Sequence, residues 1–460
     1  MLDWDRATDE VVEHLRSLIR IPSVNPPDGG PELAAGHNPA GGETAAARYC
    51  ADVLQDAGLA AEVLEAAPAR GSCFARLPAT TQRPEPPLIL LSHLDVVPVE
   101  ADTWTRDPFG GELVDGVIWG RGAVDMKDMA AMELGVMVAL VRDGGERRRD
   151  VIFAAVADEE AGGRFGALHW VKQRPDLFQD GDGRPAEAAL NEVGGYSMTV
   201  GGRRVYTIQV AEKGIVWTRM SATGTPGHGS MPHPDNPTIK LAAAVNRVSD
   251  RTRPPRLTPV VKRFLDVLGL ADVISAADRS DEVALAAALL DGLENPVLRR
   301  SINAMLRDTV TPTVIRSGQK VNVIPAAGMA ELDVRTLPGT DQQEILESIR
   351  ELAGSDVQVE SVMTMPALEW PSDAPIVELM EQALRSADPE AAAAPMMITP
   401  GTDAKGLARL GIPTYGFAPL RLDPETPFLS LFHAPDERVP VSALRFGLPV
   451  LYEVVSRFIG

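Results

Sequence analysis

The chain has 460 residues and a net charge of −20 at pH 7, with 64 Asp and Glu against 44 Lys and Arg. A single hydrophobic core usually stops growing at about 250–300 residues, so we expect two domains. Nucleic acid and anionic membranes are bound by clustered Lys and Arg, and the acidic balance therefore argues against both as partners.

Cysteine content and hydropathy indicate the cellular class. Cys50 and Cys73 are the only cysteines, which is too few for a disulfide framework. No apolar run reaches the ~20 residues that a membrane span needs. We therefore expect a cytoplasmic protein that does not cross a membrane.

The first part of the chain alternates between strand and helix patterns. We expect an amphipathic helix over 8–20, a buried strand over 87–91, a helix over 126–144, a strand over 151–157, a helix over 164–172 and a short strand ending at Glu192. This alternation is typical of a parallel sheet covered by helices. The predicted fold class is therefore α/β, with a mainly parallel sheet flanked by helices.

From about residue 212 the pattern changes. Two stretches, 213–224 and 320–339, alternate polar and apolar side chains as half-exposed antiparallel strands do, and an Ala- and Leu-rich helical region separates them. We therefore assign residues 1–211 and 371–460 to one domain and residues 212–370 to an inserted α+β domain. The alanine-rich stretch 390–394 is expected to be a surface loop.

Histidine and carboxylate residues fall at the predicted strand ends. His93, Glu159, Glu160 and Glu192 follow buried strands, and Asp125 stands between a glycine-rich turn and a helix start. Each has a simpler interpretation alone, a helix N-cap for Asp125 and solvated strand ends for the glutamates. In a parallel sheet, however, these positions meet at the edge where ligands bind. Like charges gathered there require neutralisation, which divalent cations supply, and mixed imidazole–carboxylate ligands suit zinc.

Three segments resemble motifs of the co-catalytic zinc amidohydrolases and exopeptidases. They are SHLDVVPV at 92–99, WGRGAVDMK at 119–127 and VADEEAGG at 156–163, in the family's order and spacing. This family includes aminoacylase, acetylornithine deacetylase, succinyl-diaminopimelate desuccinylase and carboxypeptidases of the G and S types. The resemblance implies a zinc-exopeptidase-like catalytic domain, an inserted lid and dimerisation domain, and a homodimer.

The resemblance also implies a site for two divalent metal ions, zinc first, with cobalt or manganese as alternatives. Asp125 would bridge the two ions. His93 and Glu192 would complete the first site, and Glu160 and His433 the second.

Two further residues would act beside the metals if the resemblance holds. Asp95 would hold and polarise His93, which fixes the tautomer of a histidine ligand. Glu159 would be the general base for the water that bridges the metals.

Other residues are implied at the substrate. His228 would reach the partner subunit's active site and stabilise the oxyanion, although alone it reads as a loop histidine. Asn322 and Arg335 would line the substrate end, with Arg335 binding a carboxylate; a strand salt bridge is its simpler interpretation. The loop PGTDAKGL would contribute Gly401, Thr402 and Lys405.

Three positions depart from the family pattern. Lys405 stands where Arg is common, Asp128 where Gly is usual and Asp436 where Asn is expected. Lysine binds a carboxylate as a point charge, without the guanidinium fork. The remaining histidines are interpreted as surface, packing or bystander residues: His14, His37, His169 and His233.

The leading functional hypothesis is metal-dependent hydrolysis of an amide bond in an N-acyl amino acid or small peptide that bears a free carboxylate. The alternative within this class is a dipeptidase or carboxypeptidase. A two-metal phosphoesterase would require several Arg or Lys around the metals, and the motifs offer few. A non-enzymatic relative would have no use for Glu159 as an unliganded base.

Overall fold

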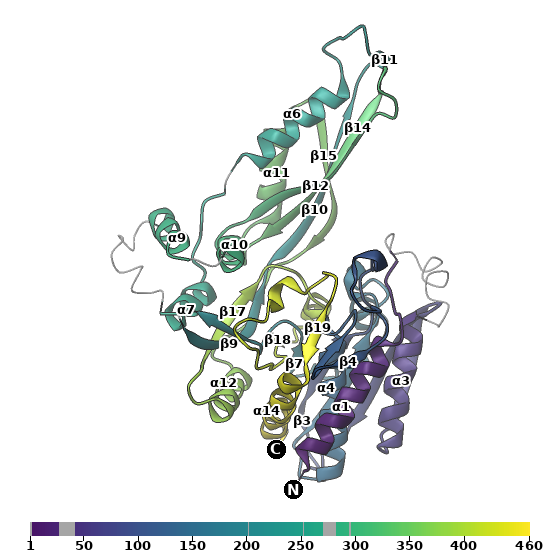
Figure 1. Ribbon diagram of the computed structural model, residues 1–460, viewed down its shortest axis with the longest axis vertical. Coiled ribbons are helices and arrows are strands. Elements are labelled where there is room, and N and C mark those ends of the chain that lie inside the picture. The colour runs from purple at the N-terminus through teal and green to yellow at the C-terminus, as the bar shows by residue number, and fades with distance from the viewer. Residues whose placement is uncertain (1, 27–41, 201, 252, 270–281, 294–295) are drawn as a thin grey trace. The chain divides into compact units, whose positions relative to one another are not determined.

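The computed structural model describes residues 2–26, 42–200, 202–251, 253–269, 282–293 and 296–460, so His37 lies outside the described residues. The chain divides into two compact units (Figure 1). Unit 1 comprises Met1–Val210, Trp370–Met396 and Thr402–Gly460, and unit 2 comprises Ala211–Glu369 and Met397–Gly401.

The sheet of unit 1 has a parallel centre and antiparallel flanks. Its central strands are, in spatial order, β6 (Arg149–Val156), β3 (Glu85–His93), β7 (Ala188–Asn191) and β18 (Thr414–Gly416). Beyond β6, the antiparallel strands β2 (Arg70–Leu77) and β1 (Ala61–Ala67) continue the sheet. Beyond β18, the sheet continues with the antiparallel strand β9 (Arg203–Glu212). β9 also pairs with β8 (Ser197–Val200) and β17 (Ala392–Ile398). The predicted α/β class with a mostly parallel central sheet is confirmed.

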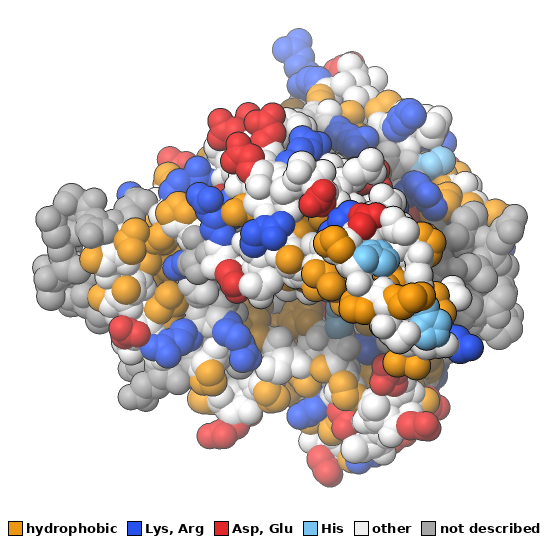
Figure 2. Space-filling view, turned by 90° about the horizontal axis from the view of Figure 1, so that it is seen from above, with side chains coloured by type: hydrophobic (Ala, Val, Ile, Leu, Met, Phe, Trp, Pro, Cys, Tyr) orange, Lys and Arg blue, Asp and Glu red, His pale blue; other side chains and the backbone are white. Residues whose placement is uncertain are grey.

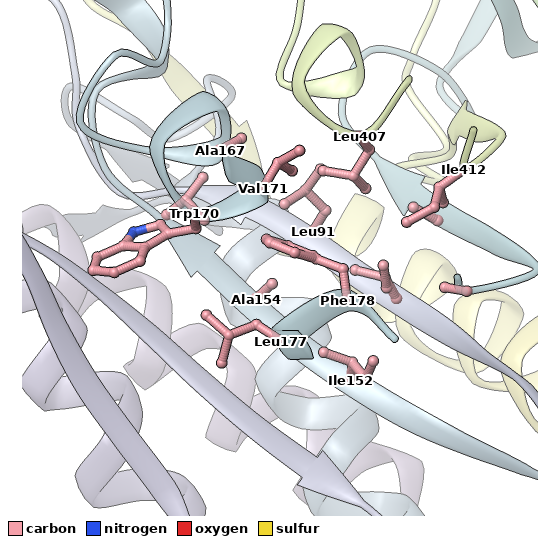
Figure 3. Close-up of a cluster of buried hydrophobic side chains, with 14 of the residues drawn as sticks. Leu91, Ile152, Ala154, Ala167, Trp170, Val171, Leu177, Phe178, Leu407 and Ile412 are labelled. Atoms are coloured by element: carbon pink, nitrogen blue, oxygen red, sulfur yellow. The ribbon is translucent and has the colours of Figure 1, made fainter. Parts of the chain in front are cut away.

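Helices cover both faces of this sheet because its strands are apolar on both faces. One face carries α1 (Trp4–Ile19), α3 (Gly42–Asp56), α4 (Lys127–Asp143), α12 (Pro375–Ala387) and α14 (Val441–Ile459). The other face packs α5 (Ala167–Gln173), α13 (Ala404–Leu407) and short 3-10 turns against alternate strand residues. Figure 3 shows this second cluster, in which Leu91, Ile152 and Ala154 of the strands meet Trp170 and Phe178.

A small sheet joins two distant segments of unit 1. Its order is β19 (Arg438–Pro440), β5 (Val117–Trp119) and β4 (Glu112–Val114). Arg438 pairs with Trp119, and the Gly120 N–H donates to the Glu437 carbonyl at 2.9 Å. This pairing places the chain after His433 beside the chain that leads to Asp125.

Unit 2 is built on an antiparallel sheet with the order β12 (Thr309–Ser317), β14 (Ala327–Thr336), β10 (Gly214–Thr223) and β15 (Val357–Met365). α6 (Pro237–Ser249) and α11 (Gln342–Ala353) bury the apolar face of this sheet. The remaining elements of unit 2 are β11 (Gly227–His228), β13 (Val323–Ile324), β16 (Leu368–Glu369), α7 (Pro259–Val267), α9 (Glu282–Asp291) and α10 (Pro296–Met305).

One prediction fails in this description. Residues 390–394 are not a surface loop, because Ala392 begins β17 and Ala394 has no exposed surface. Alanine carries little strand signal of its own, and burial in the sheet decides its structure. Among the described helices, none has the length and apolar character required to span a membrane.

Candidate metal centre

The ends of three parallel strands gather the first site residues. His93 is the last residue of β3 and pairs in register with Val156, the last residue of β6. Glu159 and Glu160 follow Val156 by three and four residues and lie in a single 3-10 turn, η2 (Glu159–Ala161). Glu192 comes directly after β7. Parallel neighbours end at the same edge of a sheet, so these side chains come together there.

Among the described residues, two groups of histidine and acidic side chains have ligand atoms within 4.8 Å of one another: His93–Asp125–Glu192 and Asp125–Glu160–His433. In the first group, His93 Nε2 lies 3.2 Å from Asp125 Oδ1 and 3.8 Å from Glu192 Oε2. In the second group, His433 Nε2 lies 3.1 Å from Asp125 Oδ2 and 3.2 Å from Glu160 Oε2. Asp125 therefore offers one carboxylate oxygen to each group.

The electrostatics of the two groups follow from burial and crowding. Burial disfavours the imidazolium of His93, but its contacts with Asp125, Asp95 and Glu192 outweigh this and raise its pKa well above the ordinary value. Hydrogen bonds to Asp125 and Glu160 raise the pKa of His433 to about 10. Burial and the nearby Asp125 raise the pKa of Glu160 to about 7. Both imidazoles therefore carry protons that offset the crowded carboxylates, and a bound cation could take over this role.

The donor set fits divalent cations. Three carboxylates and two imidazoles converge, which are ligands that zinc, cobalt and manganese accept. Glu160 Oε1 is buried and has no hydrogen-bond partner among the described residues, as expected of an oxygen reserved for a cation.

The carboxylate of Asp95 holds the turn that carries the two glutamates. Its Oδ1 accepts the Glu159 N–H at 3.0 Å, and its Oδ2 accepts the Glu160 N–H at 3.1 Å. His93 Nδ1 lies 3.0 Å from the backbone carbonyl of Asp95 and 3.5 Å from the carboxylate. The orientation of His93 therefore depends mainly on the carbonyl, while the carboxylate positions both glutamates.

Glu159 is half-buried on the same turn but belongs to neither group of ligand atoms. Burial, and secondarily the negative charge of Glu192, raise its pKa well above the ordinary range of a glutamate. A raised pKa lets a carboxylate take up a proton near neutral pH, which is the property required of a general base.

A buried ion pair, Arg121–Glu437, binds the backbone of Asp125 and His433. Glu437 Oε1 accepts the N–H groups of Val124 at 2.8 Å and Asp125 at 3.2 Å. Its Oε2 accepts Arg121 Nη1 at 2.7 Å, and Arg121 Nη2 donates to the carbonyl of His433 at 3.3 Å. Sequence reasoning did not identify Arg121 and Glu437 as site residues, although both lie within or beside quoted motifs.

The three departures from the family pattern have structural positions. Asp436 Oδ1 accepts both the N–H (2.8 Å) and the hydroxyl (3.0 Å) of Thr105, so it secures the loop after His433. Asp128 is buried and lines a small pocket with Met126 and Glu192, and burial raises its pKa well above the ordinary value. It is therefore not a surface charge. Lys405 is only 4% exposed.

The loop before α13 contains an acid that the sequence analysis passed over. Asp403 is buried, its Oδ2 has no hydrogen-bond partner among the described residues, and its negative charge helps raise the pKa of Glu159. The neighbouring Thr402 Oγ1 accepts the N–H of Ala404, the first residue of α13, at 3.1 Å. The signal that could have found Asp403 is its place within the quoted PGTDAKGL segment.

The predicted substrate residues of unit 2 do not form one cluster. His228 pairs with Val323 across β11 and β13, and the Gly229 N–H donates to the Asn322 carbonyl at 2.8 Å, so these two exposed residues are neighbours. Arg335 is far from them along β14. The chain leading to His228 pairs with Ala327 at one end of β14, and Arg335 lies eight residues from Ala327, a separation of about 26 Å along the strand. Its guanidinium pairs with Asp333 at 2.7 Å.

The surroundings of His228 are apolar and exposed. Met231, Val321 and Val323 have exposed fractions of 67%, 102% and 48%. Figure 2 shows histidine side chains among hydrophobic ones on the face seen from above Figure 1.

A model of peptidase family M20/M25/M40 matches residues 89–457, a range that includes both groups of candidate ligands. The chain belongs to this family. It is accordingly a hydrolase of the metallopeptidase and aminoacylase class.

Curated relatives within the family are similar over most of the chain. Probable carboxypeptidase S-like 2 of Dictyostelium discoideum is 26% identical over 389 residues, which cover 80% of this chain and 71% of the relative. N-fatty-acyl-amino acid synthase/hydrolase PM20D1 of Mus musculus is 27% identical over 386 residues, 80% of this chain and 74% of the relative. Aminoacylase-1 of Sus scrofa is 27% identical over 457 residues, 96% of this chain and 93% of the relative.

Solved M20 structures share the fold. The metallo-carboxypeptidase Sso-CP2 from Sulfolobus solfataricus aligns with a TM-score of 0.70 at 18% identity, over 97% of this chain and 98% of that chain. The YXEP protein of Bacillus subtilis, described as a dinuclear metal binding peptidase, aligns with a TM-score of 0.60 at 14% identity, over 99% of this chain and 99% of that chain.

Proposed function

We propose that this protein hydrolyses the amide bond of an N-acyl amino acid, or of a small peptide, that bears a free carboxylate. The observation that carries the proposal is the shared Asp125, whose two carboxylate oxygens face two separate sets of ligands. His93 and Glu192 would hold one divalent cation with Asp125, and Glu160 and His433 the other. Zinc is the first candidate for both, with cobalt or manganese as alternatives.

A pair of divalent cations polarises a carbonyl and makes water acidic. The protein's part is then to move protons and stabilise charge. Glu159 lies one residue from the ligand Glu160 and outside both ligand groups, so it is free to take the proton of the attacking water and pass it to the leaving amine. Its raised pKa suits both steps.

We infer that His228 stabilises the oxyanion in the active site of a partner subunit. Its exposed imidazole stands among exposed apolar side chains, which are typical of a surface that packs against another chain. Its Nδ1 lies 2.7 Å from the hydroxyl of Ser230, which leaves Nε2 available to a substrate. Asn322, its neighbour, would act beside it.

The carboxylate of the substrate would be bound by Arg335, with Lys405, Gly401 and Thr402 as further candidates. Arg335 Nη1 is buried and has no hydrogen-bond partner among the described residues, as expected of a donor awaiting a ligand. Because Arg335 lies at the end of β14 away from the segment that leads to His228, the two residues would serve two different active sites of a homodimer.

The names of the relatives favour acylated amino acids as substrates, since aminoacylase-1 and an N-fatty-acyl-amino acid synthase/hydrolase are among them. Peptide hydrolysis from the carboxyl end is the second candidate, supported by the carboxypeptidase S-like relative.

The test is a substrate panel with purified protein supplied with zinc, cobalt or manganese. N-acetyl amino acids, long-chain N-acyl amino acids, dipeptides and a phosphomonoester are incubated with and without a chelator, and released amines or phosphate are measured. We expect metal-dependent release of amino acids from the acylated substrates. Release of phosphate alone, or no release with any metal, would refute the proposal.

A further inference from the structure

A buried polar network extends from Asp95 on the side away from His93. Five side chains with at most 3% exposure compose it: Asn25, Glu43, Arg70, Asp95 and Asp158. None of the five belongs to the two ligand groups. The network joins the segment after α1, helix α3, strand β2 and the turn η2.

Asn25 is the centre of this network. Its Nδ2 donates to Asp95 Oδ2 at 2.8 Å and lies 3.3 Å from Asp158 Oδ1. One amide group therefore contacts Asp95, in the segment after β3, and Asp158, the residue before η2. Without a donor between them, two buried acids at this spacing would repel each other.

Arg70 determines which way the amide of Asn25 points. Its Nη2 donates to Asn25 Oδ1 at 3.1 Å, and its Nη1 pairs with Glu43 and lies 3.4 Å from Asp158 Oδ1. A guanidinium offers only donors, so the oxygen of the amide must face it. The NH₂ group must then face Asp95 and Asp158.

The backbone of Asn25 is fixed as well. Its N–H donates to the Val96 carbonyl at 2.8 Å, and Val24 forms a parallel bridge with Val96. Asn25 is thus anchored to the chain that follows β3, the strand that ends at His93.

The first residues of η2 and the chain that follows this turn contact the acids that Asn25 contacts. Asp95 accepts the N–H groups of Glu159 and Glu160 at 3.0 and 3.1 Å. Asp158 precedes the turn with a φ of +70°, a left-handed conformation that is uncommon for residues other than glycine, and its Oδ2 accepts the Phe165 N–H at 2.8 Å. The position of both glutamates therefore rests on contacts that converge at Asn25.

We propose that Asn25, oriented by Arg70, is a positioning residue of the hydrolytic site. It holds Asp95 and Asp158 so that η2 presents Glu159 to the substrate and Glu160 to the cation. Asn25 reaches these residues through Asp95 and Asp158 and touches no ligand atom of either group. This inference rests on the proposed function, in which Glu159 is the base.

The test compares Asn25→Asp and Asn25→Ala with the wild type. Asn25→Asp keeps the shape but replaces the donor by an acceptor, and Asn25→Ala removes the donor without adding charge. The matched control is Asn246→Asp on the exposed surface of α6, where Asn246 Nδ2 donates to Asp250 Oδ2 at 2.8 Å in the same chemical arrangement.

We expect kcat to fall about 10–100-fold in both Asn25 variants, as is typical when a residue behind a metal ligand is changed, with KM little altered. The Asn246 variant should retain wild-type kcat. The visible absorption bands of the cobalt-loaded protein should shift in both Asn25 variants and not in the control, because the orientation of Glu160 changes. Thermal unfolding measures the folded state of each variant.

Wild-type kcat in either folded Asn25 variant, or unchanged cobalt bands in both, would overturn the proposal. Loss of the folded state in both variants would also overturn it, since the role of Asn25 would then be structural. The cobalt spectrum requires no turnover. If the wild type hydrolyses none of the tested substrates, the proposed function fails while the spectrum still decides the role of Asn25.

Discussion

The buried pair Arg121–Glu437 provides a sharp test of how the candidate metal centre is held. In Glu437→Gln, the remaining amide oxygen can still accept the N–H groups of Val124 and Asp125. The amide nitrogen then faces Arg121 Nη1, which lies 2.7 Å from Glu437 Oε2 in the wild type, and two donors oppose each other.

The expected size of the effect follows from burial. The side chains of Arg121 and Glu437 are 3% and 0% exposed. Removing one partner of such a pair leaves a buried charge uncompensated, which typically costs about 3–5 kcal/mol of the free energy of unfolding. Because Glu437 also holds Asp125, and Arg121 the carbonyl of His433, we expect metal affinity to fall about 10–100-fold.

The assay is urea denaturation of the metal-free protein, followed by titration with zinc in a competing chelator. The matched control is Glu331→Gln, which breaks an exposed pair with Arg219 at 2.8 Å. Such surface pairs contribute about 0–1 kcal/mol, so the control should unfold almost as the wild type does. If Glu437→Gln were as mild as Glu331→Gln in both measurements, the positioning role of the pair would be refuted.

Three further predictions concern pH, metal binding and subunit sharing. Burial and the nearby Asp95 raise the pKa of Glu43 from 4.5 to about 8. The folded state therefore binds more protons than the unfolded state between these two values, and the free energy of unfolding should fall as pH rises from 4.5 to about 8. Glu43→Gln should flatten this fall in urea titrations, and an unchanged pH dependence would contradict the assignment. Glu159→Gln should abolish turnover while both metals stay bound, whereas Glu160→Ala should lose metal; equal metal loss by elemental analysis would refute the two roles. His228→Ala should lower kcat far more than metal content, and mixing it with Glu159→Gln should restore part of the activity if subunits share sites, whereas no recovery would rule out the shared site.

Much of the fold could be predicted from local patterns of apolar and polar residues in the sequence. The apolar runs 87–91 and 151–157 became the central parallel strands β3 and β6, because strands buried on both faces require continuous apolar sequence. The prediction of a surface loop at 390–394 was wrong because alanine is found in loops, helices and strands alike. Its neighbours in the sheet decide that this stretch enters strand β17.

The residues that support the site were harder to predict. Asn25 and Arg70 are ordinary polar residues in an unremarkable turn and strand, and their contacts join segments 45 residues apart. Arg121 and Glu437 are 316 residues apart and meet because β5 pairs with β19. No local pattern reports such a pairing, since it depends on which strands the whole chain brings side by side.

The sequence by itself determined the α/β class and placed His93, Glu160 and Glu192 at strand ends, because hydrophobic periodicity and strand direction are local properties. Only the tertiary structure decided that Asp95 holds the glutamate turn and that Glu437 and Arg121 hold the segments of Asp125 and His433. It also placed Arg335 at the end of β14 away from the segment that leads to His228. Distances between side chains from remote segments arise from packing, and packing is a property of the folded chain.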